Sequence, residues 1–450
     1  MVQYNAILEI LISISLLVFI YLLACIFRNR HFNRHHPYRK YFIAGLSVKI
    51  SGAVVISCIY LFYYGGGDTT NFFRHATIIN SAFNESAVKW LNLLFRIPED
   101  HTVGYYPYIS ALEWYHDTSS YFVSSVTAFI SLLLGGTFMP TAIAFAVLSF
   151  TGVWALFRTF ARAYPAYTRQ VAIAILFIPS VVIWGSGIFK DTLCICALGW
   201  LVYYVFQIMA YKKYTIKNIM FLILSIYIVY LIKVYILIAF LPALLVWIIF
   251  VYTKNIPSRA AKLFINISVS VFICALTYFT LSYLGEAYLG RYSLNKISET
   301  AKITRGWISY ASGDEGSSYD LGEIDNPGDM LLKLPQAINV TLFRPYIWEA
   351  RKIFALVSAL ESLLFLILTI KVIFTVGLST AWKTIAADPI IQFCLIFSLL
   401  FAYSVGISTY NFGALSRYKI PCLPFYGLAV LLIYYKNQPK GNYLLRVLKI

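Results

Sequence analysis

The sequence has few charged residues. Only 12% of its 450 residues are Asp, Glu, Lys or Arg, whereas a soluble domain carries about 25%. Hydrophobic residues make up 60% of the chain and recur in blocks of roughly twenty, the length that crosses about 30 Å of hydrocarbon. A soluble core cannot bury so many blocks of this length. The composition therefore excludes an ordinary soluble enzyme and predicts an integral membrane protein.

The sequence also lacks clustered cysteines and internal repeats. Its seven cysteines are scattered singly, and none of their spacings is that of a metal site or a disulfide framework. The nearest pair, Cys194 and Cys196, would point to different faces of a helix. We expect these cysteines to be packing residues. The sequence predicts no protein metal site and no certain cofactor, and it leaves a divalent metal open.

The apolar blocks predict an all-α polytopic transmembrane bundle of about 10–12 spans, with residues 1–450 forming a single membrane domain. The blocks fall at residues 6–27, 42–64, 121–135, 139–157, 169–187, 191–210, 218–252, 264–284, 353–376, 389–409 and 420–435.

The basic residues predict how the bundle is oriented. The formal net charge of +17 does not indicate nucleic-acid binding, because Lys and Arg lie in short loops between apolar blocks, as they do on the cytoplasmic side of membrane proteins. Two longer loops, 65–120 and 285–350, are placed on the extracytoplasmic side by this pattern. Loop 65–120 has six acidic and three basic residues, and its stretches 87–95 and 105–115 resemble helices that lie in the membrane interface.

Two apolar blocks do not fit a simple crossing pattern. Block 121–135 is short and ends at Gly135-Gly136; a full crossing would place the following basic residues outside, so its crossing number stays open. Block 218–252 is too long for one span and has Lys233 in its middle. It fits a re-entrant pair of helices with Lys233 at the tip. A lysine in lipid costs about 2.5–3.5 kcal/mol, so we expect Lys233 either to face a cavity or partner or to extend to the outer surface.

Asp68 follows the second apolar block directly, within Gly65-Gly66-Gly67-Asp68-Thr69. Three glycines allow a tight turn and a close approach to a ligand. Asp68 has two interpretations: an N-cap of a helix that starts at Thr69, or a carboxylate at the outer membrane rim that acts as a general base. Asn71 and His75 lie one turn apart on the same face of that helix and could support the site.

Several further cations fall where the orientation rule predicts few of them. Lys190 precedes Asp191 at a boundary between spans, Arg344 precedes Glu349 before a later span, and Arg417 and Lys419 precede the last span. Each motif alone is explained by a neutralised turn or by interfacial anchoring. Taken together, the cations predict a site for a phosphate or pyrophosphate head group, since Arg binds such groups in bidentate fashion and Lys as a point charge. These cations are Lys190, Lys233, Arg344, Arg417 and Lys419.

These motifs resemble those of the GT-C superfamily of polytopic glycosyltransferases, which take a sugar from a polyprenyl-phosphate carrier on the extracytoplasmic side. The resemblance rests on Asp68 early in the first large loop, on the amphipathic loop segments, on Lys190-Asp191 and on Arg417-Tyr418-Lys419-Ile420-Pro421. It covers most of the chain in layout. It implies Asp68 as the base and the basic residues as holders of the lipid phosphate. Two departures are that Asp68 follows the second span instead of the first, and that the paired acidic motif is absent, which puts a metal requirement in doubt.

Three functions remain open at this point. The first is a glycosyltransferase that moves a sugar from a polyprenyl-phosphate-linked donor to a glycan or lipid acceptor, in a multi-pass protein of the bacterial inner membrane that takes part in cell-envelope polysaccharide biosynthesis. The second is a polysaccharide polymerase or ligase of the O-antigen or capsule type, which uses polyprenyl-diphosphate-linked oligosaccharides. The third is a lipid or solute transporter, which would show broken helices in corresponding positions of two halves.

Overall fold

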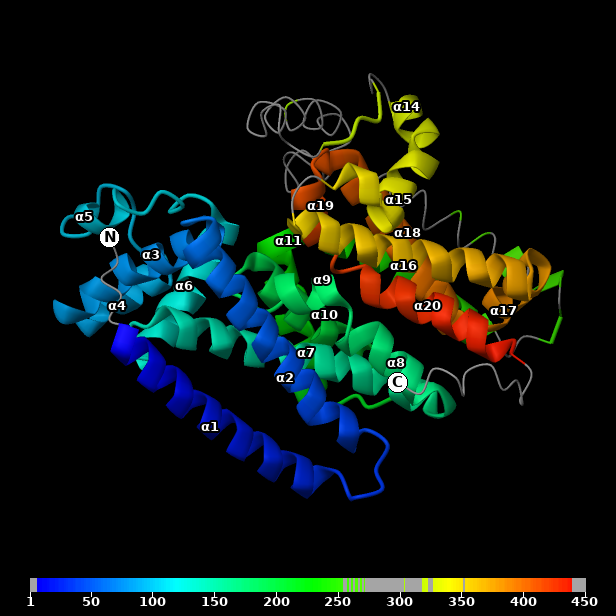
Figure 1. Ribbon diagram of the computed structural model, residues 1–450, viewed down its shortest axis with the longest axis horizontal. Helices are drawn as coiled ribbons and strands as arrows, with labels where there is room; N and C mark the ends of the chain where they lie inside the picture. Colours follow the sequence, from blue (N-terminus) through cyan, green and yellow to red (C-terminus); the bar gives the residue numbers. More distant parts are fainter. Residues whose placement is uncertain are drawn as a thin grey trace. The chain divides into compact units, whose positions relative to one another are not determined.

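The chain folds as an all-α protein, as expected. The computed structural model describes residues 6–253, 318–322, 327–350 and 353–438, with isolated positions between 257 and 303. Within these residues all regular structure is helical, apart from one β-bridge between Ser318 and Asn411 (Figure 1). Seven of the described helices are long and apolar enough to cross a membrane, or eight if the bent pair at the C-terminal end counts as one span. This protein is therefore an integral multi-pass membrane protein.

Eight of the eleven apolar blocks correspond to these seven helices and the bent pair. Block 121–135 forms a helix too short for the same class, block 169–187 forms two short helices, and block 264–284 lies almost entirely outside the described residues. Loop 285–350 is described only at 303, 318–322 and 327–350.

The chain divides into two compact units, which are described separately below. Unit 1 contains Met1–Thr168 and Pro179–Val234, and unit 2 contains Arg169–Ile178 and Tyr235–Ile450. The helices of unit 1 are α1 (Ala6–His31), α2 (Arg39–Cys58, continued by the π-turn η1, Ile59–Tyr63), α3 (Asp68–Ser81), α4 (Ala87–Leu94), α5 (Tyr106–Ile109), α6 (Thr118–Leu133), α7 (Phe138–Ala163), α9 (Pro179–Trp184) and α10 (Lys190–Val205, continued by η4, Phe206–Ala210).

Helices α7 and α10 form the core of unit 1 and run parallel. The Leu148 carbonyl of α7 accepts from the Cys196 thiol of α10, and the Trp200 indole of α10 donates to Thr151 Oγ1 of α7 at 3.1 Å. The contacts move forward along both helices together, so the two helices run in the same direction. Their backbones touch at two glycines: a Cβ on Gly152 would lie 2.1 Å from the Cys196 carbonyl oxygen. Small residues at such contacts let helices approach closely in an apolar medium.

Helix α2 packs antiparallel to α7, which sorts the charges of unit 1 to two ends. Phe42 near the start of α2 packs edge-on against Phe150 and Trp154 of α7. The basic end carries Arg39 at the start of α2, Arg162 at the end of α7 and the lysines after α10. The opposite end carries the starts of α3, α7 and α10. This is the charge separation that the sequence predicted for the cytoplasmic and extracytoplasmic ends.

Both ends of α6 lie at this second end, which settles the crossing of block 121–135. The residue before α6, Asp117, contacts Lys190 at the start of α10. The last turn of α6 leads through Gly135 and Gly136, both with positive φ, directly into the start of α7. Because α7 and α10 begin at the same end, α6 does not traverse the bundle, and the basic residues after α7 stay at the basic end.

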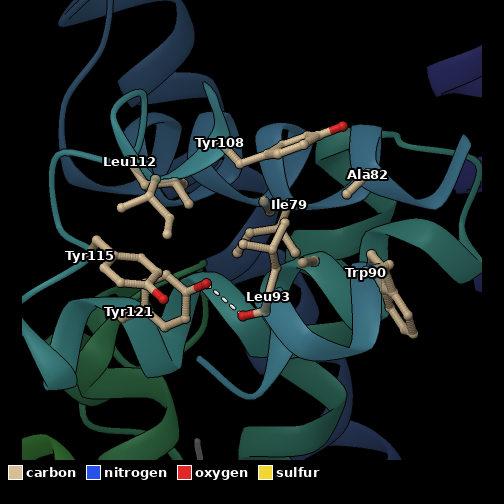
Figure 2. Close-up of a cluster of buried hydrophobic side chains, with 11 residues drawn as sticks. Ile79, Ala82, Trp90, Leu93, Tyr108, Leu112, Tyr115 and Tyr121 are labelled. Atoms are coloured by element: carbon tan, nitrogen blue, oxygen red, sulfur yellow. Dashed lines mark hydrogen bonds between the residues drawn. The ribbon is translucent and has the colours of Figure 1, made fainter. Parts of the chain in front are cut away.

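Loop 65–120 has a hydrophobic core of its own, formed with α6 (Figure 2). Trp90 and Leu93 of α4 and Tyr108 of α5 are buried, and the Tyr121 hydroxyl of α6 donates to the Leu93 carbonyl at 2.5 Å. Segment 87–95 is helical as predicted, whereas segment 105–115 contains only the single turn α5. The other faces of α4 and the following turn carry exposed apolar side chains: Val88, Leu91, Phe95 and Ile97.

Unit 2 is a second helical bundle. Its helices are α8 (Thr168–Leu176), α14 (Pro327–Leu332), α15 (Leu334–Phe343), the 3₁₀ turn η7 (Ile347–Glu349), α16 (Ile353–Val376), α17 (Leu378–Ala387), α18 (Pro389–Thr409), α19 (Phe412–Tyr418) and α20 (Leu423–Lys436). Buried Phe393 and Phe397 of α18 pack edge-on against Phe425 of α20. Helices α19 and α20 meet at a bend of 71°. Helix α11 (Ile216–Thr253) belongs to both units, which divide after Val234.

The two-ended charge pattern can be tested by thiol labelling in intact cells. A single cysteine at exposed Glu99 is expected to react with a membrane-impermeant maleimide, and one at exposed Lys213 only after the membrane is permeabilised. The physical reason is that Glu99 lies in loop 65–120, on the side predicted to be extracytoplasmic, whereas Lys213 lies at the basic end after α10. Equal labelling of both positions in intact cells would contradict the orientation.

Candidate functional site

The first part of the candidate site is the glycine turn before Asp68. Gly65, Gly66 and Gly67 all have positive φ, at 67°, 148° and 135°, a conformation that disfavours side chains. Helix α3 begins at Asp68 itself, and Gly67 is the N-cap. The prediction that Asp68 caps a helix starting at Thr69 was therefore off by one residue, because the glycine backbone takes the non-helical cap position. The half-buried Asp68 carboxylate lies in the first turn of α3.

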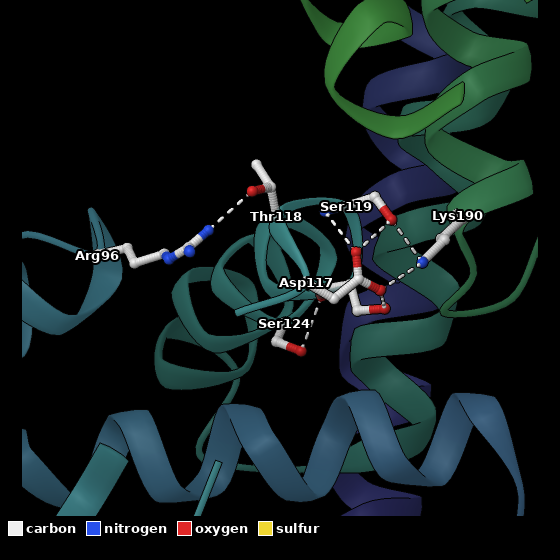
Figure 3. Close-up of polar contacts among 7 residues, drawn as sticks. Arg96, Asp117, Thr118, Ser119, Ser124 and Lys190 are labelled. Carbon is white, nitrogen blue, oxygen red and sulfur yellow. Dashed lines mark hydrogen bonds and ion pairs between the residues drawn. The ribbon is translucent and has the colours of Figure 1, made fainter. Parts of the chain in front are cut away.

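Asp117 and Lys190 join the start of α6 to the start of α10 (Figure 3). Lys190 Nζ lies 3.2 Å from Asp117 Oδ2 and donates to Ser119 Oγ at 2.6 Å. Partial burial alone would raise the pKa of Asp117, but hydrogen bonds from Ser120 and Ser119 and the charge of Lys190 lower it to about 2. Asp117 is thus held ionised opposite a lysine.

Asp191 and Lys233 form a buried ion pair. Lys233 Nζ donates to Asp191 Oδ1, and the two side chains are 6% and 2% exposed. The backbone of α11 is non-helical at Lys233, with φ −148° and ψ 77°, so the helix breaks at the predicted position. Lys233 therefore faces a partner and does not extend to the outer surface. The proposed re-entrant arrangement of the two halves of α11 involves both units and stays a prediction.

The adjacent residues Lys190 and Asp191 do not neutralise each other, since each has a partner from another helix. Asp68 and Lys233 both lie close enough to Lys190 to interact with its charge. These residues form one group, here called the outer charge cluster, which consists of Asp68, Asp117, Lys190, Asp191 and Lys233. The cluster contains three carboxylates and two ammonium groups, so their formal charges cancel except for one negative charge.

His75 and Asn71 lie further along α3. His75 is fully buried, and its ring packs edge-on against Trp114 at 4.8 Å between centroids. Both of its ring nitrogens lack a hydrogen-bond partner among the described residues. Burial and the neighbouring Arg74 lower the pKa of His75 to about 4, so the ring is neutral at pH 7. Asn71 is half-buried one turn nearer to Asp68.

In unit 2 the two predicted site residues Arg344 and Glu349 form an ion pair. Arg344 Nε lies 3.1 and 3.0 Å from the two oxygens of Glu349, and Arg344 Nη2 contacts the same carboxylate. The guanidinium also lies 5.2–5.9 Å from the rings of Tyr319, Tyr346 and Phe412. One edge of Arg344 is therefore already paired.

Lys419 is fully buried between α19 and α20. Its Nζ donates to Ser362 Oγ of α16 at 2.8 Å, and Ser362 donates in turn to the Arg344 carbonyl at 3.0 Å. The buried carboxylate of Glu361 lies close enough to interact with Lys419. Arg417 is half-buried in the last turn of α19.

The five predicted cations thus fall into two groups. Lys190 and Lys233 belong to the outer charge cluster of unit 1. Arg344 and Lys419, linked through Ser362, belong to unit 2 together with Arg417. That both groups surround one ligand stays a prediction, because it requires the two units to be placed relative to each other.

Sequence reasoning missed the contacts of several charged residues, among them Asp117, Lys49 and Glu361. Asp117 precedes Thr118-Ser119-Ser120, an N-cap pattern that could have identified it. Lys49 and Glu361 each lie within an apolar block, which is itself a signal of function or of a buried partner. Lys49 is taken up again below.

No group of three or more His, Cys, Asp or Glu side chains that could hold a metal occurs in the part of the chain that the structure describes. Comparison with protein-family models, with curated proteins and with solved structures gave no match to this chain.

The Asp191–Lys233 pair leads to a double-mutant prediction. Lys233→Met alone should lower the free energy of unfolding by about 3–5 kcal/mol, because it leaves a buried carboxylate uncompensated. The double variant Lys233→Met/Asp191→Leu should recover most of this loss. The measurement is denaturant unfolding in detergent micelles, and additive losses in the double variant would contradict the pairing.

The depressed pKa of Asp117 predicts an acid-dependent stability. Its folded pKa lies below its unfolded value, so the stabilisation is complete above about pH 4 and is lost as the pH falls through about 2. Asp117→Asn keeps an N-cap but removes the charge. It should lower stability by about 1 kcal/mol at pH 6, after discounting for the half-exposed carboxylate, and by nothing once the pH lies well below the folded pKa of Asp117. A stability difference that does not change with pH would contradict this assignment.

Proposed function

We propose that this protein is a membrane glycosyltransferase that transfers a sugar from a polyprenyl-phosphate-linked donor to an acceptor at the extracytoplasmic end. The observation that carries the proposal is the position of Lys190, which is partly exposed and lies among Asp68, Asp117 and Lys233 at the end of the bundle opposite the basic loops.

The geometry supports the roles of a base and of a cation that interacts with phosphate. Asp68 follows a glycine turn that is open at Gly65, where a Cβ would meet nothing within 4 Å, and that packs against the Tyr60 ring at Gly67. In the proposed reaction an acceptor oxygen attacks the anomeric carbon, and its proton passes to the Asp68 carboxylate. The bond from the anomeric carbon to the phosphate oxygen breaks, and Lys190 stabilises the charge that develops on the departing lipid phosphate.

The pairing of the two lysines bears on how such a ligand would be held. Lys233 is buried with Asp191, whereas Lys190 has 24% of its side chain exposed and lies 3.2 Å from a half-exposed Asp117. A flexible ammonium can exchange a solvent-exposed carboxylate for a phosphate at low cost. We therefore assign the direct phosphate contact to Lys190 and a structural role to Lys233.

The experiment is transfer of labelled sugar from a polyprenyl-phosphate donor by the protein reconstituted in liposomes. Asp68→Asn should abolish transfer, with a loss of about 10²-fold or more, while donor binding persists. Lys190→Gln should weaken donor binding. Asp100→Asn is a matched control, because Asp100 lies in the same loop and forms an ion pair with exposed His116, which is not part of the outer charge cluster. Wild-type transfer by Asp68→Asn would refute the role of Asp68.

A transporter is the second candidate, and the broken helices favour it. Unit 1 has a break between α9 and α10, and unit 2 has the 71° bend between α19 and α20. Discontinuous helices in two halves are typical of transporters. Donor-dependent flux across liposomes without sugar transfer would favour this function. The polymerase or ligase alternative predicts laddered glycan products in the same transfer assay.

A further inference from the structure

Lys49 is a charged residue in the middle of α2 that the proposed reaction does not use. Its side chain is 1% exposed. Its ammonium donates to two backbone carbonyls, Val181 at 2.9 Å and Gly185 at 2.8 Å, which lie more than 130 residues away in the chain. No carboxylate pairs with Lys49 among the described residues.

The two carbonyls that Lys49 binds lie at the end of the short helix α9. A helix that stops inside an apolar bundle leaves its last carbonyls without backbone partners, and an unpaired carbonyl there is costly. Ser149 of α7 donates to the same Gly185 carbonyl at 2.7 Å. The ammonium of Lys49 thus takes the place that a bound cation takes at broken helices in membrane proteins.

One face of α2 contacts both α9 and the segment that follows it. Gly52 lies one turn after Lys49 and touches the backbone of Val182, since a Cβ there would lie 2.4 Å from the Val182 carbonyl oxygen. Further along the same face, Ile56 packs against Gly187, and the Tyr60 ring lies 5.4 Å from that of Phe189. The next residue of the chain is Lys190.

The turn between α9 and α10 is therefore held at two points. Lys49 holds its first residue, Gly185, and the Thr192 hydroxyl of α10 donates to the Gly187 carbonyl at 2.6 Å. Because only four residues separate Gly185 from Lys190, a displacement at Gly185 must move the start of α10.

We infer that Lys49 is a positioning residue, whose ammonium anchors the end of α9 to α2 and thereby sets the position of Lys190 and Asp191 in the outer charge cluster. The relevance for catalysis rests on the proposed function, but the anchoring itself does not depend on it.

Buried cysteines provide a test that needs no substrate. Cys194 lies in the first turns of α10 and is 1% exposed, and Cys394 of unit 2 is fully buried. Two backgrounds are made, each with only one of these cysteines, and their labelling rates with N-ethylmaleimide are measured. Lys49→Met should raise the labelling rate of Cys194 about tenfold or more and leave Cys394 protected.

Two further variants complete the design. Lys49→Arg keeps a donor that reaches the carbonyls and should restore most of the protection of Cys194. Lys40→Met is the matched control, because it removes an exposed lysine from the same helix, whose described contact is with the ring of Tyr41. Protection of Cys194 in Lys49→Met equal to that in Lys40→Met would overturn the inference.

Global unfolding of Lys49→Met would expose Cys394 as well, and Gly52→Ala then decides the question. Its added methyl group separates α9 from α2 without removing Lys49, and it should expose Cys194 alone. Unchanged protection of Cys194 in Gly52→Ala would overturn the inference. The two proposals can fail separately. If the wild-type protein binds no polyprenyl phosphate but the variants show the expected labelling of Cys194, the proposed function is refuted and the anchoring role of Lys49 stands.

Discussion

The structure of unit 1 depends on hydrogen bonds to the backbone groups that are left free where its helices break. Within an apolar bundle a helix can end only where other groups satisfy its free carbonyls and amides. Lys49 and Ser149 satisfy the carbonyls at the end of α9, and this permits the turn that carries Lys190 and Asp191. Lys233 lies at another break, in α11, and its ammonium pairs with Asp191. Breaks and buried charges thus coincide, and the polar groups converge where the helices stop.

Much of the bundle could be predicted from hydrophobic length alone. Eight of the eleven apolar blocks correspond to long helices or to the bent pair, because a block of about twenty apolar residues has few folds available in lipid. The break at Lys233 could be predicted as well, since a lysine in the middle of an overlong block has to be accommodated. Block 121–135 could not be placed by length, because its two ends are fixed by contacts of Asp117 and by the glycine turn that follows it.

The pairing of the site residues was less accessible to sequence reasoning. Lys190 and Asp191 are neighbours in the chain but bind partners 73 and 42 residues away. Hydropathy gives the depth of a residue but not the rotation of its helix, so no pattern in the sequence indicates which acid meets which base. The joint position of Lys190 with Arg344 or Arg417 remains a prediction for the same reason, since it depends on the placement of one bundle against another.

The parallel packing of α7 and α10 has an electrostatic consequence for the outer end. Antiparallel helices cancel each other's macrodipoles, but two parallel ones add theirs, which concentrates partial positive charge where both begin. Each of these helix starts has an acidic residue beside it. Glu9 of α1 accepts hydrogen bonds from the first two amides of α7, at 2.6 and 2.9 Å, and Asp191 lies in the first turn of α10. Helix α1 is mostly exposed along its length, so this carboxylate gives an otherwise lipid-facing span a fixed electrostatic attachment to the core.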